Sequence, residues 1–281
     1  MGREENIIIF NDTEKLCETN EKLKESIDNS IKKQKLILET DKIPAPDLKK
    51  YQARAKLIVS QKRTYEAASA YKGKKVAVLN FASASNPGGG VVRGAGAQEE
   101  CLCRCSTLYF ALDTKLMWDG FYTPHRKAHN PLHNDDIIYT PDVTVFKTDT
   151  YSPKLMDDKD WYNVDVITCA APNLRSNPSN IYNPHDGDAV KLSDNELQEL
   201  HEKKLRRILD VAVNEGCEVV ILGAFGCGAF QNDPRVVANA ARNVLPDYLN
   251  AFETIEYAIY TRRGDEKNYE AFNGALFRMK S

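Results

Sequence analysis

The chain has 281 residues, and its 38 Lys and Arg side chains nearly balance 40 Asp and Glu, for a formal net charge of −2. This length allows one large domain with a proper core, and the charge balance gives no sign of general nucleic-acid binding. No apolar run approaches the roughly 18 residues of a membrane helix, and no signal-peptide pattern opens the chain.

The first 70 residues are predicted to be a helical accessory region. Asp12 can cap a helix with an apolar stripe on a very polar body, which comprises Leu16, Leu23, Ile27 and Ile31. The prolines of Ile43-Pro-Ala-Pro46 end this helix. One weak stripe is too small for a core of its own, so we expect residues 1–70 to pack on a catalytic domain of residues 71–281.

The stretch from Ile31 to Lys75 is basic, with 13 Lys or Arg against four acids. A solvated helix face explains most such runs. The alternative is a contact with a polyanionic polymer.

A strand that opens into a glycine-rich loop is the first motif with chemical meaning. Val76-Ala-Val-Leu79 is an apolar, β-forming run, and the loop behind it ends in Gly88, Gly89 and Gly90. Three glycines leave no side chain between the backbone and a ligand, and they tolerate positive φ. In the same loop, Asn86 can contact a ribose or begin a turn before Pro87, and both interpretations stay open.

Paired acids follow the loop. After a spacer of small residues, Gln98, Glu99 and Glu100 open a helix. Neighbouring residues on a helix project about 100° apart, so Glu99 and Glu100 cannot flank one bond as the carboxyls of an ordinary glycosidase do. This geometry favours one catalytic acid and one binding residue, with Gln98 as an orienting residue. Two solvated acids, stabilised by the helix dipole alone, are the alternative.

Farther along the chain, strands alternate with helices. A capping box between Ser193 and Glu196 opens a helix that ends at Gly216. Asp233 opens another helix, and Asp265 is expected to cap the last one. Strands are predicted at residues 164–171, 218–223 and 255–260. Such alternation implies a largely parallel sheet covered on both faces, so we predict an α/β fold, a three-layer α/β/α sandwich with a mixed central sheet.

The second glycine-rich loop, Gly223-Ala-Phe-Gly-Cys-Gly-Ala-Phe230, leaves a strand and runs into a helix N-terminus. Backbone N–H groups and the helix dipole converge on anions at such places. The loop lacks the third glycine of a dinucleotide fingerprint, and the chain has no Walker sequence. Both loops fall at the carboxyl ends of strands, where open α/β sheets bind ligands. The candidate binding residues of this loop are Gly223, Gly226, Cys227, Gly228, Ala229 and Phe230.

Seven cysteines, an odd number without framework spacing, indicate free thiols in a reducing compartment and predict a cytoplasmic protein. Cys101, Cys103 and Cys105 have metal-like spacing, but on a helix Cys103 points away from the other two, so core thiols are predicted.

Three histidines with helical spacing sit among prolines that break a helix. We therefore expect scattered loop side chains rather than a metal site at His125, His129 and His133. No metal and no cofactor are predicted for this chain.

The combination of Gly88-Gly-Gly90, a short spacer and Gln98-Glu-Glu100 resembles the signature of microbial-type poly(ADP-ribose) glycohydrolases. The likeness is firm from about Thr64 onward and loose before it, and it extends to residues 101–109, 136–146 and 223–230. The resemblance implies a macrodomain fold that holds ADP-ribose at the carboxyl ends of its strands.

The resemblance also implies roles for individual residues. Glu100 would be the catalytic acid and base, and Glu99 would accept a hydrogen bond from a ribose hydroxyl. The three glycines would approach the ribose nearest the scissile bond, and the second loop would hold the diphosphate. Phe230 would stack on the substrate, although a core phenylalanine is the alternative.

We therefore predict an enzyme, a monomeric glycosidase that hydrolyses the ribose–ribose O-glycosidic bonds of poly(ADP-ribose) and releases ADP-ribose. Its partners are the polymer or ADP-ribosylated proteins, with no membrane and no sequence-specific nucleic acid. Two alternatives remain at this point, a non-catalytic ADP-ribose-binding module and a hydrolase of mono-ADP-ribosylated substrates.

Overall fold

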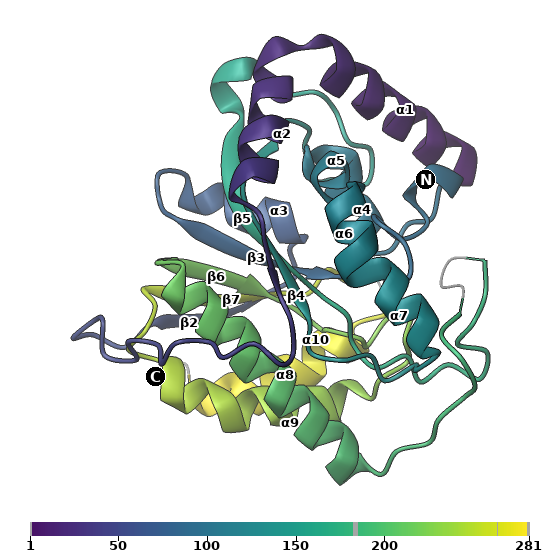
Figure 1. The fold of residues 1–281 in the computed structure, drawn as a ribbon. Coiled ribbons are helices and arrows are strands. Elements are labelled where there is room, and N and C mark those ends of the chain that lie inside the picture. The colour runs from purple at the N-terminus through teal and green to yellow at the C-terminus, as the bar shows by residue number, and fades with distance from the viewer. Residues whose placement is uncertain (1, 182–184, 263, 280–281) are drawn as a thin grey trace.

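A seven-stranded sheet forms the centre of the fold (Figure 1) in this computed structural model, which describes residues 2–181, 185–262 and 264–279. The strand order is β1-β4-β5-β3-β6-β7-β2. β4 runs antiparallel to both neighbours, and the other four pairs are parallel. The strands are Lys35–Ile37 (β1), Lys56–Ser60 (β2), Val76–Phe81 (β3), Ile137–Val145 (β4), Tyr162–Cys169 (β5), Val219–Leu222 (β6) and Thr254–Ala258 (β7). The predicted α/β fold with a mixed, largely parallel sheet is confirmed.

Helices cover both faces of this sheet. They are Arg3–Thr19 (α1), Glu21–Lys33 (α2), Thr64–Ala68 (α3), Gln98–Cys105 (α4), Leu108–Leu112 (α5), Lys115–Met117 (α6), Thr123–Ala128 (α7), Asp194–Asn214 (α8), Pro234–Val244 (α9) and Lys267–Leu276 (α10). Figure 1 shows α8, α9 and α10 on one side of the sheet and α1 to α6 on the other. Within the described ranges, no helix combines the length and apolar character needed to cross a membrane.

The central strand β3 explains why two cores form. Ala77 and Leu79 pack in the core that contains α8, α9 and α10, whereas Val76 and Val78 pack in the core that contains α3, α4 and α5. Successive side chains of a strand point to opposite faces, so a continuous apolar run buries both.

The N-terminal region forms two helices, and the prediction of one helix capped by Asp12 is wrong. Asn20 breaks the run, because its side chain accepts hydrogen bonds from the backbone N–H groups of Lys22 and Leu23 and so caps α2. Asp12 lies inside α1, where its carboxylate is 2.8 Å from Nζ of the buried Lys147. This ion pair fastens α1 to the segment that follows β4.

Two strands also come from the region predicted to be helical, which corrects that prediction. β1 pairs antiparallel with β4, and β2 pairs parallel with β7, so both edges of the sheet belong to residues 1–70. The division of the chain near residue 70 stays a prediction.

Several basic side chains of the stretch from Ile31 to Lys75 form ion pairs with acids elsewhere in the chain. Lys33 pairs with Asp142 at 2.7 Å, and Lys35 pairs with Glu215 at 2.6 Å. Such exposed pairs contribute little to stability, but they agree with a solvated charged surface. The contact with a polyanionic polymer stays a prediction.

The predicted helix ends of the C-terminal half are correct with one exception. Ser193 and Glu196 form the capping box of α8, Gly216 follows that helix with a φ of 77°, and the Asp233 side chain caps α9. The predicted cap at Asp265 is wrong, because α10 begins after Glu266, which makes no side-chain cap.

Replacing Ser193 by Ala is expected to lower the free energy of unfolding by about 1 kcal/mol. The Ser193 hydroxyl accepts from the Glu196 backbone N–H at 3.3 Å, and the Glu196 carboxylate accepts from the Ser193 N–H at 2.7 Å. Urea unfolding measures the loss, with Ser152→Ala on an exposed loop as the control. Equal stability of the two variants would show that the box adds nothing.

Candidate active site

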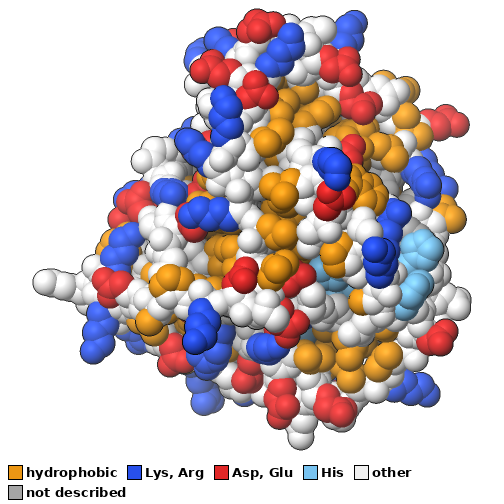
Figure 2. Space-filling view, in the orientation of Figure 1, with side chains coloured by type: hydrophobic (Ala, Val, Ile, Leu, Met, Phe, Trp, Pro, Cys, Tyr) orange, Lys and Arg blue, Asp and Glu red, His pale blue; other side chains and the backbone are white. Residues whose placement is uncertain are grey.

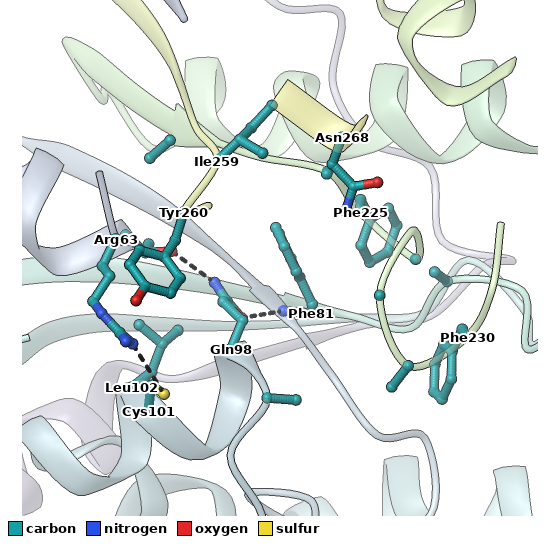
Figure 3. Close-up of a pocket in the computed structure, with 18 of the residues that line it drawn as sticks. Arg63, Phe81, Gln98, Cys101, Leu102, Phe225, Phe230, Ile259, Tyr260 and Asn268 are labelled. Carbon is teal, nitrogen blue, oxygen red and sulfur yellow. Dashed lines mark hydrogen bonds between the residues drawn. The ribbon is translucent and has the colours of Figure 1, made fainter. Parts of the chain in front are cut away.

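The candidate site lies at the edge of the sheet where the parallel strands end. β3, β5, β6 and β7 run in the same direction, so their carboxyl ends meet there, as the strand–loop pattern predicts. The loop after β3, the N-terminus of α4 and the loop after β6 come together at this edge (Figure 3).

Gln98 joins α4 to the end of the central strand. Its Oε1 accepts from the Phe81 N–H at 2.9 Å, and its Nε2 donates to the Leu79 carbonyl at 2.8 Å and to the Thr64 hydroxyl at 3.1 Å. The amide thus continues the hydrogen bonding of β3 beyond the sheet. These bonds fix the start of α4, from which the two glutamates project, and the orienting role of Gln98 stays a prediction.

Glu99 is only 3% exposed, and both of its carboxylate oxygens are engaged. Oε2 accepts from the Ser83 N–H at 2.7 Å, and Oε1 accepts from the Asn80 side-chain amide at 3.2 Å. Burial raises the pKa of Glu99 well above its ordinary value, and the neighbouring Glu100 raises it further, while these hydrogen bonds oppose both effects. Glu99 therefore holds the loop after β3 in place.

Glu100 is 6% exposed, and it differs from Glu99 in the hydrogen bonding of one carboxylate oxygen. Its Oε1 accepts from the Gly90 N–H at 2.9 Å, whereas its buried Oε2 has no hydrogen-bond partner in the part of the chain that the structure describes. Burial raises the pKa of Glu100, and the Gly90 N–H and the charge of Arg104 oppose this shift. A protonated carboxyl with one unengaged oxygen is the group that general-acid catalysis needs. The alternative of two solvated acids does not fit these buried side chains.

The glycine loop lies directly against the two carboxylates. Gly88 and Gly89 have φ values of 63° and 59°, which L side chains rarely adopt. A Cβ on Gly89 would lie 2.6 Å from Oε1 of Glu100 and 3.0 Å from Oε2 of Glu99. A Cβ on Gly88 would lie 2.8 Å from the Tyr109 ring. Only glycine allows this close approach, so the loop packs directly against the carboxyls of Glu99 and Glu100.

Asn86 begins the turn that leads to these glycines. Its carbonyl accepts from the Gly89 N–H at 3.1 Å, and its side-chain oxygen accepts from the guanidinium of Arg126. The turn-forming interpretation of Asn86 therefore describes its contacts, and its contact with a ribose stays a prediction.

A cavity of about 260 Å³ adjoins the N-terminus of α4 (Figure 3). Its aromatic walls include Phe81 and Phe225, whose ring centres are 5.7 Å apart. Ile259 and Asn268 line the side formed by the C-terminal part of the chain. The chain thus contributes a mostly apolar hollow beside the glutamates, which is typical of a site for a flat ring.

The second glycine-rich loop contributes to this cavity only in part. Gly226, Gly228, Ala229 and Phe230 line it, together with two of their neighbours. Gly226 has a φ of 78°, and a Cβ there would lie 2.8 Å from the Ala171 side chain. Gly223 and Cys227 are absent from the described lining. Phe230 both lines the cavity and belongs to the core, so neither interpretation of it excludes the other.

The second loop does not pass directly into a free helix N-terminus, which corrects the expectation. Residues 231–233 separate it from α9, and the Asp233 side chain already accepts from the Arg235 N–H at 2.8 Å. An anion on this loop would therefore contact loop N–H groups rather than the first turn of α9.

The sequence patterns missed a group of charged and aromatic residues at the cavity mouth. The Arg63 guanidinium lies 4.0 Å from the centre of the Tyr260 ring, and one of its Nη atoms is 3.6 Å from Sγ of Cys101 (Figure 3). Beside them, burial raises the pKa of Asp149 to about 6. Arg63 and Tyr260 each follow the end of a strand, and that position was the available signal.

Cys101 lines the cavity, whereas Cys103 and Cys105 are buried in the core. Within the described ranges, no group of three or more His, Cys, Asp or Glu side chains could hold a metal ion. The prediction of a histidine loop is wrong for His125, which lies on α7, because Pro124 occupies the first turn of that helix instead of breaking it.

Arg104 is a buried charge one helical turn after Glu100. The residue is 2% exposed. Its guanidinium donates to the Ala95 carbonyl at 2.6 Å and to Sγ of Cys101 at 3.3 Å. Among the residues that the structure describes, no carboxylate lies within 4.0 Å of its guanidinium. A buried guanidinium without a paired carboxylate among the described residues acts on the nearby acids through its electric field, and it opposes the raised pKa of Glu100.

Comparison with known proteins accounts for this arrangement. The sequence model of the family described as "Microbial-type PARG, catalytic domain" matches residues 4–148, where PARG stands for poly(ADP-ribose) glycohydrolase. No curated protein sequence matches the chain.

Solved structures are similar over nearly the whole chain. The poly(ADP-ribose) glycohydrolase of Thermomonospora curvata has 27% identity and a TM-score of 0.81, over 96% of this chain and 98% of that one. The same protein bound to the inhibitor ADP-HPD has 28% identity and a TM-score of 0.78, with the same coverage. The Deinococcus radiodurans enzyme in complex with ADP-ribose has 28% identity and a TM-score of 0.73, over 90% and 98% of the two chains. Since the family match spans more than half of its residues, this chain belongs to the microbial-type poly(ADP-ribose) glycohydrolases.

Proposed function

We propose that this chain hydrolyses the ribose–ribose O-glycosidic bonds of poly(ADP-ribose) and releases ADP-ribose. The observation that carries the proposal is Glu100, a buried carboxyl whose Oε2 has no partner within the described residues and which adjoins a loop of three glycines. Family membership supports the same activity. Similar solved structures that hold ADP-ribose or ADP-HPD support the ligand class.

Glu100 acts as the general acid and then as the general base. In its protonated form it donates from Oε2 to the ribose oxygen of the departing unit as the glycosidic bond breaks. The substrate's own diphosphate helps to stabilise the cationic sugar. The carboxylate then takes a proton from a water molecule that attacks the same carbon, and the acid is restored. The raised pKa of Glu100 supports this cycle, because it keeps the carboxyl protonated at higher pH than usual.

Glu99 and the loops bind the substrate. Glu99 accepts from a ribose hydroxyl in addition to the Ser83 N–H and the Asn80 amide, since a carboxyl oxygen can accept more than one hydrogen bond. Gly88, Gly89 and Gly90 face the ribose of the scissile bond. Adenosine occupies the cavity between Phe81 and Phe225, and the loop of residues 223–230 contacts the diphosphate.

Release of free ADP-ribose from poly(ADP-ribosyl)ated protein tests the proposal, with quantification by chromatography and a parallel measurement of ADP-ribose binding. Steady release supports the glycohydrolase. Tight binding without release would contradict it and favour a binding module. Release from mono-ADP-ribosylated substrates alone would favour the third candidate. A metal chelator in the same assay tests the proposal that no metal cofactor takes part.

Arg104→Met is expected to move the alkaline fall of kcat/KM to higher pH. Activity falls as rising pH deprotonates the general acid. Removal of a positive charge that opposes the raised pKa of Glu100 raises that pKa further, so the fall shifts upward by about half to one pH unit. Arg104→Lys keeps the charge and should leave the profile nearly in place. An unchanged profile in Arg104→Met would contradict this electrostatic role.

The compartment and oligomeric state are part of the proposal. All seven cysteines are free, which supports a reducing cytoplasm. We expect a monomer, which light scattering after gel filtration tests directly.

A further inference from the structure

Arg126 on α7 is a half-buried cation whose donors are only partly used. Its Nε donates to the Ser85 carbonyl at 2.7 Å, and one Nη donates to the Asn86 side-chain oxygen. The guanidinium lies 4.7 Å from the centre of the Trp118 ring. A guanidinium has five N–H groups, and these two bonds are the ones that the described residues provide.

None of the acids that the structure describes forms an ion pair with this guanidinium. Within the described ranges, no carboxylate lies within 4.0 Å of it, and burial alone lowers the pKa of Arg126. The nearest carboxylate along this network is Asp186, which is buried and accepts from the Ser85 hydroxyl at 2.8 Å and from Asn173 at 2.8 Å. A half-buried arginine with donors that the described residues leave unused is a ready partner for an anion.

Arg126 and the cavity approach the glutamates from different directions. Arg126 binds Asn86, whose carbonyl accepts from Gly89 in the turn that carries Gly90 to Glu100. The cavity instead lies against the other residues of the α4 N-terminus, and its described lining includes no residue of α7 or of the turn at residues 85–90. A ligand that spans the glutamates therefore has one end in the cavity and the other near Arg126.

Two exposed histidines extend this rim. The rings of His129 and His185 are 5.5 Å apart. His129 ends α7, and a Cβ on Gly187 would lie 2.0 Å from its carbonyl oxygen, so residues 185–187 lie directly against the end of that helix. Figure 2 shows histidine side chains grouped at the edge of the molecule beside α7, with Lys or Arg side chains next to them.

The chemistry of the polymer supplies an anion for this rim. The scissile bond joins the terminal ADP-ribose to an adenosine ribose of the next unit, and that unit carries a diphosphate and an adenine. With the terminal adenosine in the cavity, the next unit leaves on the side of the glycine loop. Guanidinium forks match phosphate oxygens, and aromatic rings stack with bases.

We propose that Arg126, with His129 and His185 beside it, forms a subsite for the diphosphate of the polymer unit on the leaving side of the scissile bond. This subsite rests on the proposed function. It makes the enzyme prefer chains over a single ADP-ribose group on a neutral aglycone, since only chains carry the second diphosphate.

Two substrates with the same scissile carbon test the subsite. One is purified poly(ADP-ribose), and the other is ADP-ribose linked to a small uncharged fluorogenic phenol. Arg126→Gln should lower kcat/KM for the polymer about tenfold and change it less than about twofold for the phenol conjugate. A plot of log(kcat/KM) for the polymer against log(salt concentration) should become less steep, by about one unit of slope for each lost phosphate contact. Lys159→Gln removes an exposed charge outside the basic stretch and should change neither rate.

A binding arm separates this subsite from the proposed activity. The Glu100→Gln protein should bind a short poly(ADP-ribose) oligomer more tightly than ADP-ribose, as measured by fluorescence anisotropy. Adding Arg126→Gln should abolish most of this difference in affinity. That loss supports the subsite even if the parent protein cleaves neither substrate, a result that would contradict the proposed function alone. Equal losses on polymer and phenol conjugate, or no loss on either, would overturn the subsite and leave Arg126 as a support for Asn86.

Discussion

Glu100→Gln is expected to lower ADP-ribose release from poly(ADP-ribose) by a factor of about 10³, while the affinity for ADP-ribose changes less than about threefold. The amide keeps the bond from the Gly90 N–H through its carbonyl oxygen, so the glycine loop stays in place. It has no proton to donate and no carboxylate to activate water. Initial rates by chromatography and binding by calorimetry measure the two effects.

Glu199→Gln is the matched control for this variant. Glu199 is an exposed acid on α8, far along the chain from the site, and its loss should leave both rate and affinity unchanged. If Glu100→Gln retained more than about a tenth of the activity, Glu100 would not be the acid, because general acid–base catalysis contributes at least about 10².

Gly89→Ala is expected to reduce activity by about 10²-fold or more and to lower the free energy of unfolding by about 1–3 kcal/mol. The φ of 59° strains any L residue there. The added methyl would lie 2.6 Å from Oε1 of Glu100, so the turn or the carboxyl has to move. Rates on the polymer and thermal unfolding measure the change.

Gly274→Ala provides the comparison for this substitution. Gly274 lies in α10, and a Cβ there has nothing within 4 Å, so the same change should stabilise the fold slightly. A Gly89→Ala protein with normal activity would mean that the loop can retreat from the carboxyls without loss of function.

Local sequence patterns predicted the helices and strands whose conformation depends mainly on their own residues. The apolar run of β3 fixed a strand buried on both faces, and Ser193 with Glu196 fixed the start of α8. β1 and β2 were missed for the opposite reason. β1 has three residues and begins with a lysine, and β2 alternates exposed or half-buried positions with buried ones inside a basic stretch. Their strand conformation depends on pairing with β4 and β7, which lie about 100 and 200 residues later in the chain.

The candidate site was predictable where one motif carried it and not where distant segments meet. Gln98, Glu99 and Glu100 lie within one helical turn, so their proximity follows from the sequence. Arg63 and Tyr260 are in contact only because β2 and β7 pair in parallel and end together. No local pattern reports such a pairing, and the same holds for the cavity wall that Phe225 forms.

The bond pattern of Gln98 has a consequence for how this enzyme can change. Gln98, the first residue of α4, is hydrogen-bonded to the backbone on both sides of Asn80 in the central strand. A shift of α4, which carries Glu100, would therefore break bonds to the buried centre of the sheet. Amide exchange at the start of α4 should then be as slow as in β3. Substitutions that change substrate preference are therefore expected in the surrounding loops, while the position of Glu100 relative to the sheet stays constant.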